Sequence, residues 1–235
     1  MMKDNETYYD AFSTRYDKPR DKGYHAYLDE AETRCISEFV GGRVLEAGCG
    51  TGLIMTRLKD KADLLTGIDI SMGMLKTARS RGLAVFQGDV TSLPFADNTF
   101  DLTYSFKVLA HIPHIRQAVS EMVRVTRPGG WIAAEFYNRD SFRFLIKQFH
   151  AGMVAAGITE RDVFLRFDTL EEFTGYFPEN VRVVKVCSAR HCLLSPVVLN
   201  LPVVSRFAWK FEELLAKTPA RRLGGFVTVV FQKQS

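Results

Sequence analysis

Short apolar runs alternate with amphipathic segments along the first part of the chain, which is the pattern of alternating strands and helices. Five apolar runs are bounded by turn residues or charges, and we predict them as strands. They cover residues 43–47, 63–68, 83–87, 99–106 and 131–137. Strands separated by helices imply a parallel sheet with helices on both faces.

Apolar side chains repeat at helical spacing between these runs. Tyr8, Phe12 and Tyr16 stand at i, i+4 and i+8, so they predict an N-terminal helix with an aromatic stripe. Further helices are predicted over 24–39, 53–59, 71–81 and 115–123. The turn Arg127-Pro128-Gly129-Gly130 is predicted to follow the last of them. The short connections favour a doubly wound α/β sheet.

The pattern is less regular beyond residue 137. Helices are predicted over 140–156, 169–177 and 203–217, and strands over 181–188 and 225–233. Two late strands that flank a helix predict a hairpin-like edge of the sheet. We predict the stretch 157–167 as a loop or lid.

The composition narrows the class of protein. An apolar share of 46% and a charged share of 25% are those of an ordinary globular domain, and 235 residues fit one such domain. The net charge of +4 is mild and mixed along the chain, so we expect no nucleic-acid partner. No apolar run approaches the roughly 20 residues of a membrane span, and the first residues do not resemble a signal peptide. We therefore expect a cytoplasmic protein without stable membrane insertion.

The cysteines give no sign of a metal site or a disulfide framework. Cys35, Cys49, Cys187 and Cys192 form no Cys-x-x-Cys pair, and no histidine stands at zinc-ligand spacing beside them. We predict four reduced, mostly buried thiols and no metal.

A glycine loop after the first strand is the strongest chemical signal. Gly48, Gly50 and Gly52 stand where a strand ends and a helix begins, and glycine is needed where the backbone turns sharply or touches a ligand. This predicts a nucleotide-type ligand, with a tight turn that binds nothing as the alternative. Glu46 before the loop would repel a pyrophosphate and therefore disfavours a nicotinamide dinucleotide. The alternative for Glu46 is a solvated charge at the end of the strand, without a ligand.

Two further carboxylates stand at the ends of the next two strands. Asp69 is predicted to accept hydrogen bonds from the hydroxyls of a ribose. Asp89 and the Val90 N–H group suit the edge of an adenine. For Asp89 the alternative is a cap for the turn that follows it.

Together these motifs resemble the class I S-adenosylmethionine (SAM)-dependent methyltransferases, in the group that includes the ubiquinone and menaquinone biosynthesis type. The matching stretches are 44–52, 67–71, 88–90, 93–95, 100–101, 111–112 and 127–130. The resemblance implies a seven-stranded, mostly parallel sheet of order 3-2-1-4-5-7-6 with strand 7 antiparallel. It also implies a single domain over 1–235, with a helical cap at 1–40, a cofactor-binding core at 43–137, and acceptor-side helices and a lid at 138–225.

The resemblance also implies which residues contact SAM. They are Tyr16, Glu46, Gly48, Gly50, Gly52, Asp69, Ile70, Asp89, Val90 and Phe106. Ile70 would pack on the adenine, Phe106 would lie beside the methionine end, and Tyr16 would close over the cofactor. Lys107 departs from the family, because many relatives carry an apolar or small residue there. We predict it as a surface lysine, with pairing to an acidic acceptor in the pocket as the alternative.

The implied function is methyl transfer from SAM to a small-molecule acceptor, with oxygen favoured as the methylated atom. The alternatives are C-methylation of a quinone-like or lipophilic acceptor and a non-catalytic SAM-binding regulator. His111, His150 and His191 are candidate bases, and for each the alternative is a local structural hydrogen bond. A monomer or a homodimer is expected.

The stretch 192–211 is apolar, and basic residues lie in it and after it, at Arg206, Lys210, Lys217, Arg221 and Arg222. It could line a pocket for a lipophilic acceptor or contact a membrane surface. Glu212 and Glu213 argue against the membrane surface, so we favour core packing with a solvated face.

Overall fold

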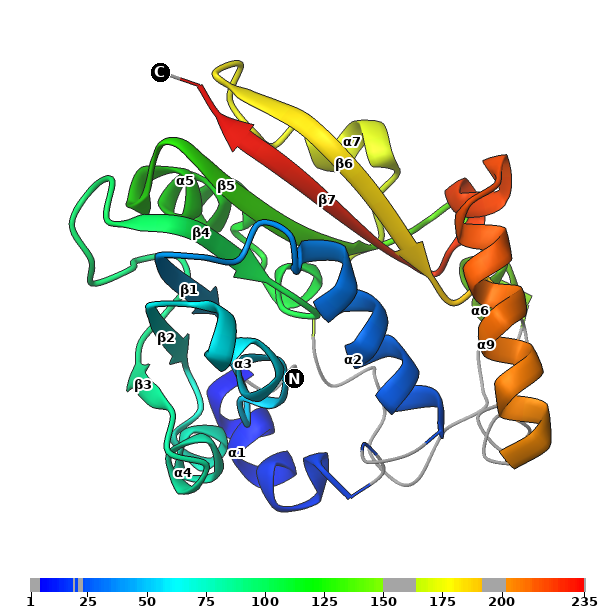
Figure 1. Cartoon of the computed structure of the whole chain (residues 1–235), viewed down its shortest axis with the longest axis horizontal. Coiled ribbons are helices and arrows are strands. Elements are labelled where there is room, and N and C mark those ends of the chain that lie inside the picture. Colours follow the sequence, from blue (N-terminus) through cyan, green and yellow to red (C-terminus); the bar gives the residue numbers. More distant parts are fainter. Residues whose placement is uncertain (1–4, 19, 21–22, 150–163, 192–201, 235) are drawn as a thin grey trace.

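The computed structural model in Figure 1 describes residues 5–18, 20, 23–149, 164–191 and 202–234. Its strands form one seven-stranded sheet of order β3-β2-β1-β4-β5-β7-β6. The first five strands pair in parallel, whereas β7 is antiparallel to both β5 and β6. The predicted fold class, strand order and hairpin-like edge are therefore confirmed.

Most elements lie where the hydrophobic pattern predicts them. The strands are β1 (Arg43–Ala47), β2 (Leu64–Asp69), β3 (Ala84–Gln87), β4 (Phe100–Ser105), β5 (Thr126–Tyr137), β6 (Val181–Ala189) and β7 (Phe226–Lys233). The helices are α1 (Asn5–Tyr16), α2 (Gly23–Ile36), α3 (Leu53–Leu58), α4 (Met72–Ser80), α5 (Ile115–Val125), α6 (Phe142–Phe149), α7 (Leu170–Thr174) and α9 (Pro202–Ala216). Single 3-10 turns are η1 (Lys59–Lys61), η2 (Leu109–His111) and η4 (Pro219–Leu223).

Two elements differ most from the prediction. β5 begins at Thr126 and contains the expected turn 127–130, because Thr126 already pairs with Phe100 and a register shift follows. α7 is shorter than predicted, because its capping box at Thr169 sets the start and Gly175 ends it. The helix predicted to residue 156 is described to residue 149, and only 164–167 of the predicted lid are described.

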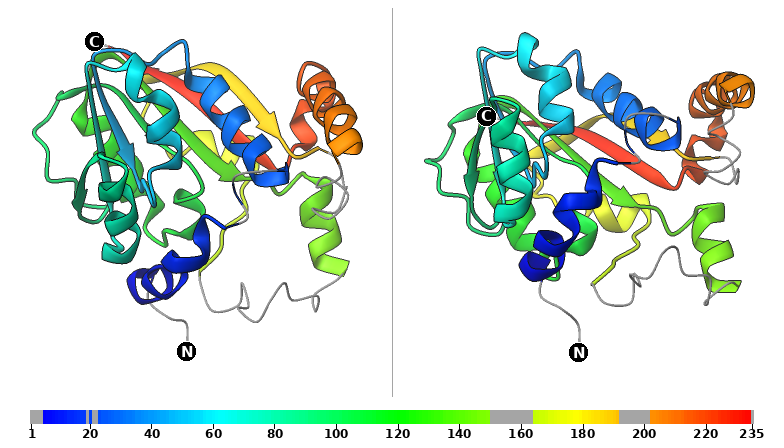
Figure 2. Two further views of the ribbon diagram at one scale, coloured as in Figure 1. Left: turned by 60° about the horizontal axis from the view of Figure 1, so that its bottom comes forward. Right: turned by 90° about the horizontal axis from the view of Figure 1, so that it is seen from below.

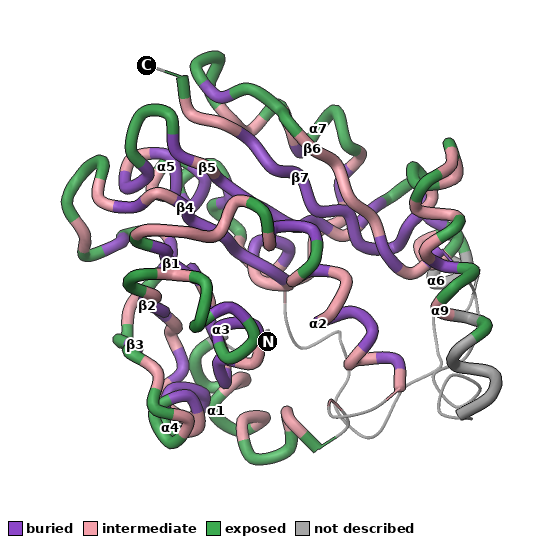
Figure 3. The backbone as a smooth tube through the Cα atoms, in the orientation of Figure 1, coloured by how far each residue is buried: buried purple, intermediate pink, exposed green. Residues whose placement is uncertain are grey.

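The sheet is covered on both faces, which explains its continuous apolar strands. α5 packs on the side to which Leu45 and Ile132 point, whereas α2 and α3 pack on the side of Val44 and Leu102. Figure 3 shows the buried backbone concentrated in the central strands. In Figure 2, α1 lies next to α4, beyond the carboxyl ends of β1 and β2.

A disulfide joins Cys35 and Cys187, which corrects the prediction that the cysteines are all reduced. Cys35 lies near the end of α2 and Cys187 lies on β6, 152 positions later in the sequence, with Cα atoms 6.1 Å apart. No local spacing signals such a contact, because it depends on how α2 docks on the sheet. Cys49 is free and buried as predicted, and Cys192 lies outside the described residues.

Candidate functional site

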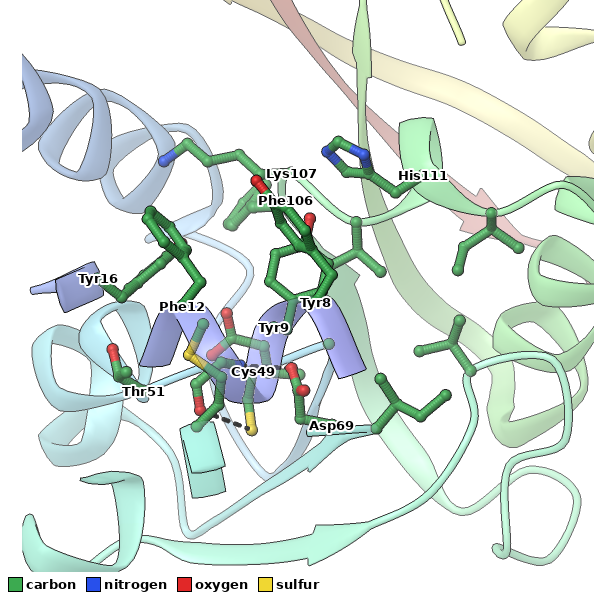
Figure 4. A pocket seen from close by; sticks show the side chains of 18 of the residues that line it. Tyr8, Tyr9, Phe12, Tyr16, Cys49, Thr51, Asp69, Phe106, Lys107 and His111 are labelled. Atoms are coloured by element: carbon green, nitrogen blue, oxygen red, sulfur yellow. Dashed lines mark hydrogen bonds between the residues drawn. The ribbon is translucent and has the colours of Figure 1, made fainter. Parts of the chain in front are cut away.

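A cavity of about 400 Å³ opens at the carboxyl ends of β1, β2 and β4, and α1 borders it. Its wall consists of the loops that follow these parallel strands, which is where open α/β sheets bind ligands. Figure 4 shows aromatic side chains of α1 on one side and Asp69, Phe106 and His111 on the others. The structure therefore brings together residues from both ends of the predicted core and from the N-terminal helix.

Two glycines of the loop after β1 line this cavity. Gly48 has a φ of +85°, and a Cβ atom there would lie 2.3 Å from Val108. Gly50 has a φ of +53°, and a Cβ there would meet no atom within 4 Å, so its α-carbon faces open space. Gly52 is absent from the wall. Its φ is +77° and a Cβ there would lie 2.2 Å from Leu83, so packing requires this glycine.

The carboxylate of Asp69 is fixed at the cavity wall by backbone donors. It accepts hydrogen bonds from the N–H groups of Gly50 at 2.8 Å and Ser71 at 2.9 Å. Burial raises its pKa above the usual value. Asp89 also lines the cavity and accepts a hydrogen bond from the Thr91 N–H group at 2.8 Å, so the predicted local cap is present beside the predicted ligand position. Ile70 and Val90 lie on the same wall.

Glu46 is a buried carboxyl group at the inner end of the cavity. It is 3% exposed and accepts a hydrogen bond from the Tyr104 hydroxyl at 3.0 Å. Burial raises its pKa well above the usual range, so the group favours the neutral form until a cation approaches. A sulfonium or an ammonium group in the cavity would favour the ionised form. Glu46 is therefore suited to a ligand that carries a cationic group.

The stripe predicted for the N-terminal helix faces the cavity. Tyr8, Phe12 and Tyr16 line it together with Tyr9 (Figure 4). The Tyr16 hydroxyl is buried, which raises its pKa. The guanidinium group of Arg20 lies 4.2 Å from the centre of the Tyr16 ring. α1 therefore covers the site with an aromatic surface.

Two aspartates connect α1 and the residues after it to the loops that follow β1 and β2 through hydrogen bonds. Asp10 accepts a hydrogen bond from the Ser71 hydroxyl at the start of α4. Asp17 accepts hydrogen bonds from the Thr51 hydroxyl and from the guanidinium group of Arg81, each at 2.7 Å. Because Thr51 belongs to the glycine loop, the position of the aromatic cover is coupled to that loop.

Lys107 is buried beside the cavity, which corrects the prediction of a surface lysine. Its Nζ lies 3.0 Å from Asp29 Oδ1 and 2.7 Å from Glu32 Oε1, and the side chain is 14% exposed. Asp29 and Glu32 are neighbours on α2 at i, i+3, and Arg20 donates a second hydrogen bond to Asp29 at 3.1 Å. These contacts keep Lys107 cationic and raise its pKa despite burial. In Figure 4 the Lys107 chain runs toward α2.

Glu135 of β5 is the third acid of this cluster. It is 2% exposed, and burial and then Glu32 raise its pKa well above the usual range. Burial thus favours the neutral form of Glu135, whereas Asp29 and Glu32 form the ion pairs with Arg20 and Lys107.

Replacing Glu135 by glutamine is expected to stabilise the protein more at pH 8 than at pH 5. The native carboxyl has a higher pKa folded than unfolded, so the wild type loses stability as pH rises above the unfolded pKa. Glutamine keeps a donor but cannot ionise. Thermal melts at both pH values measure the effect, at about 2–4 °C for each kcal/mol gained. An equal shift at both pH values would show that Glu135 does not carry the proton.

The three candidate histidines differ in their position relative to the cavity. His111 lines the cavity, its Nδ1 lies 3.1 Å from the Phe164 carbonyl oxygen, and the Tyr137 hydroxyl lies 3.4 Å from its Nε2. His191 is not on the cavity wall. It is buried, 2.9 Å from Glu212 and 3.0 Å from the Ser188 hydroxyl, so its hydrogen bonds are structural. His150 lies outside the described residues.

Several cavity residues were not predicted from the sequence. They are Arg20, Glu32, Thr51 and Tyr137. The i, i+3 spacing of Asp29 and Glu32 was a visible signal for a shared helix face, but nothing local showed that the face turns inward. Tyr137 could have been predicted most easily of these four, because it ends a predicted strand at the edge of the sheet where ligands bind.

Comparisons with known proteins agree with this geometry. Residues 45–134 match the family model described as a methyltransferase domain. A malonyl-[acyl-carrier protein] O-methyltransferase of Buchnera aphidicola is 36% identical over 99 residues, which are 41% of this chain and 40% of that protein. A demethylmenaquinone methyltransferase of Renibacterium salmoninarum is 38% identical over 105 residues, covering 43% and 44%. The match therefore spans less than half of each relative.

The whole fold also has a solved counterpart. A SAM-dependent methyltransferase of Thermotoga maritima, described as a possible histamine N-methyltransferase, superimposes with a TM-score of 0.68 at 19% identity. The alignment covers 97% of this chain and 99% of that one. These findings confirm the class I methyltransferase fold and agree with the resemblance stated from the motifs.

Proposed function

We propose that this protein is a class I SAM-dependent methyltransferase that methylates a hydroxyl oxygen of a small molecule. Its fold and the family match of residues 45–134 support the class. One observation carries the proposal. Asp89, the glycine loop and His111 line the same cavity, so the proposed cofactor contacts and a candidate base share one site. The relative described as an O-methyltransferase supports oxygen as the acceptor atom.

The cofactor would occupy the end of the cavity near β1, β2 and β3. Asp69 would accept hydrogen bonds from the ribose hydroxyls, with Asp89 and Val90 at the adenine edge. Gly48 and Gly50 allow close approach of the chain to the methionine part. SAM would supply a methyl group bound to a sulfonium sulfur. The sulfur would keep the electron pair of that bond when the methyl group is transferred.

Arg20 is the residue that we assign to the carboxylate of SAM. Among the described residues that line the cavity, Arg20 and Lys107 carry permanent positive charge. Lys107 is held by two carboxylates, whereas the ion pair of Arg20 is with Asp29 alone. A guanidinium group has five N–H donors, so further hydrogen bonds remain available. Arg20 and Glu46 thus offer opposite charges to the two ends of an amino acid group.

His111 is the candidate base for the acceptor. A carbonyl oxygen can only accept, so the contact with Phe164 places the imidazole proton on Nδ1 and leaves Nε2 as the acceptor. Nε2 would take the hydroxyl proton of the substrate as the oxygen forms its bond to the methyl carbon. Burial raises the pKa of Tyr137, so its hydroxyl stays protonated and lies 3.4 Å from Nε2. The substrate hydroxyl would replace Tyr137 at this nitrogen. Alignment of the reacting atoms supplies much of the rate.

C-methylation of a quinol-like acceptor is the second candidate, and the relative described as a demethylmenaquinone methyltransferase favours it. Both reactions need removal of a hydroxyl proton, so the same base serves either. Incubation with isotopically labelled SAM and a panel of phenols and quinols separates them. O-methylation is expected, and product whose label resists ether cleavage would identify the carbon as the acceptor instead.

Replacing Asp69 by alanine is expected to weaken SAM binding by about tenfold to a hundredfold. Two hydrogen bonds from ribose to a charged acceptor are lost, and such bonds contribute about 1.5–3 kcal/mol each before water replaces part of them. Isothermal titration calorimetry with SAM and S-adenosylhomocysteine measures the change.

Two comparisons keep this experiment decisive. Asp97→Ala removes a carboxylate that pairs with Arg124 and is absent from the cavity wall, so SAM affinity is expected to stay unchanged. NADH is expected not to bind the wild type. An Asp69→Ala variant with wild-type affinity would refute the ribose position, and tight binding of NADH would refute the choice of cofactor.

A further inference from the structure

Helix α9 exposes an apolar face at the end of the molecule opposite α4 (Figure 1). Phe207 is 72% exposed, Phe211 is 50% exposed and Leu214 is 58% exposed. Their spacing of i, i+4 and i+7 places them on one side of the helix. The other side is packed, because the Trp209 ring lies 5.5 Å from that of Tyr27 on α2. Large side chains therefore cluster on the solvent side of this helix.

The acids of α9 are turned away from this face. Glu212 is 6% exposed and accepts a hydrogen bond from the His191 N–H group at 2.8 Å. Glu213 forms an ion pair with Arg34 of α2 at 2.6 Å. Both acids are therefore engaged with the rest of the protein. Glu212 and Glu213 therefore do not oppose contact of this face with a membrane surface, as the sequence alone predicted they would.

Basic side chains border the apolar face. Lys210 and Lys217 are exposed, one helical turn after Phe207 and Leu214 respectively. Two exposed arginines, Arg221 and Arg222, follow on η4. Exposed aromatic and aliphatic side chains with a cationic border are typical of a helix that lies in the interface of an anionic bilayer.

We propose that α9 binds the surface of a bilayer that contains anionic phospholipid. Phe207, Phe211 and Leu214 enter the acyl boundary, and Lys210 and Lys217 lie at the headgroup phosphates. The charges favour lipid over a second copy of this chain, because paired faces would bring four lysines together without acids between them. None of the described helices is long and apolar enough to cross a membrane. This inference goes beyond the proposed methyl transfer.

Co-sedimentation with lipid vesicles tests the proposal. The wild type is expected to bind vesicles of phosphatidylcholine and phosphatidylglycerol at least about tenfold more strongly than phosphatidylcholine alone, and less strongly at high salt. The variant F207S/F211S/L214S is expected to lose about tenfold or more in binding to the anionic vesicles. The variant K210Q/K217Q is expected to lose most of the preference for phosphatidylglycerol.

A matched control and a second readout separate this proposal from the proposed reaction. Phe86 is 53% exposed on β3, so Phe86→Ser removes a similar aromatic group far from α9 and should leave vesicle binding unchanged. SAM affinity should be the same in all of these variants. Equal binding to both vesicles, or anionic binding that survives both multiple substitutions, would overturn the proposal. So would a wild-type dimer in ultracentrifugation that F207S/F211S/L214S converts to a monomer without any vesicle binding.

Discussion

Replacing Lys107 by alanine is expected to lower the free energy of unfolding by about 3–5 kcal/mol. The ammonium group lies within 3.0 Å of both Asp29 and Glu32, which are 1% and 3% exposed. Removing the cation leaves two buried carboxylates with Arg20 as their neighbouring cation. Urea unfolding at neutral pH, followed by circular dichroism, measures the loss.

Lys185 supplies the matched control for this experiment. Its Nζ lies 2.6 Å from Glu38, but Lys185 is 35% exposed and Glu38 is 62% exposed. Surface pairs of this kind contribute roughly 0–1 kcal/mol, so Lys185→Ala should change stability little. The double variant Asp29→Asn with Glu32→Gln should recover part of the loss in a Lys107→Ala background, because it removes the unpaired charges. If Lys107→Ala costs no more than Lys185→Ala, the cluster is not a buried ion pair.

The same cluster shows where prediction from the sequence stops. The glycine loop, Asp69 and Asp89 could be predicted because each lies within a few residues of a strand end, where the fold fixes the direction of the ligand edge. Lys107 was wrongly predicted as a surface residue, because its partners lie 75 and 78 positions earlier on α2. The Cys35–Cys187 disulfide spans 152 positions and escaped prediction for the same reason. Contacts between α2 and the sheet follow from tertiary docking, which leaves no local pattern.

The candidate histidines show a second limit of prediction from the sequence. All three candidates follow a predicted strand or lie on a helix near the ligand edge, so type and position along the chain could not rank them. The distinction arises from partners: Glu212 and Ser188 hold His191 outside the cavity, whereas Phe164 and Tyr137 hold His111 at its wall. Of the ten residues predicted to contact SAM, nine line the cavity and Gly52 does not. The residues around His111 meet only in the folded chain.

Replacing His111 by alanine is expected to lower kcat by about a hundredfold to ten-thousandfold for a phenolic acceptor, the usual contribution of a positioned base. The affinity for SAM should change little, because none of the proposed cofactor contacts involves the imidazole. His114→Ala is the control, because His114 is exposed at the cavity rim.

An acceptor that is already ionised distinguishes a base from a structural histidine. A phenol with electron-withdrawing substituents has no proton to lose at neutral pH, so His111→Ala should slow its methylation far less than that of an ordinary phenol. Loss of cavity geometry would slow both acceptors equally, because alignment matters to each. Added imidazole should also restore part of the rate with the ordinary phenol. Equal losses for the two acceptors, without rescue, would assign His111 a structural role through its contacts with Phe164 and Tyr137.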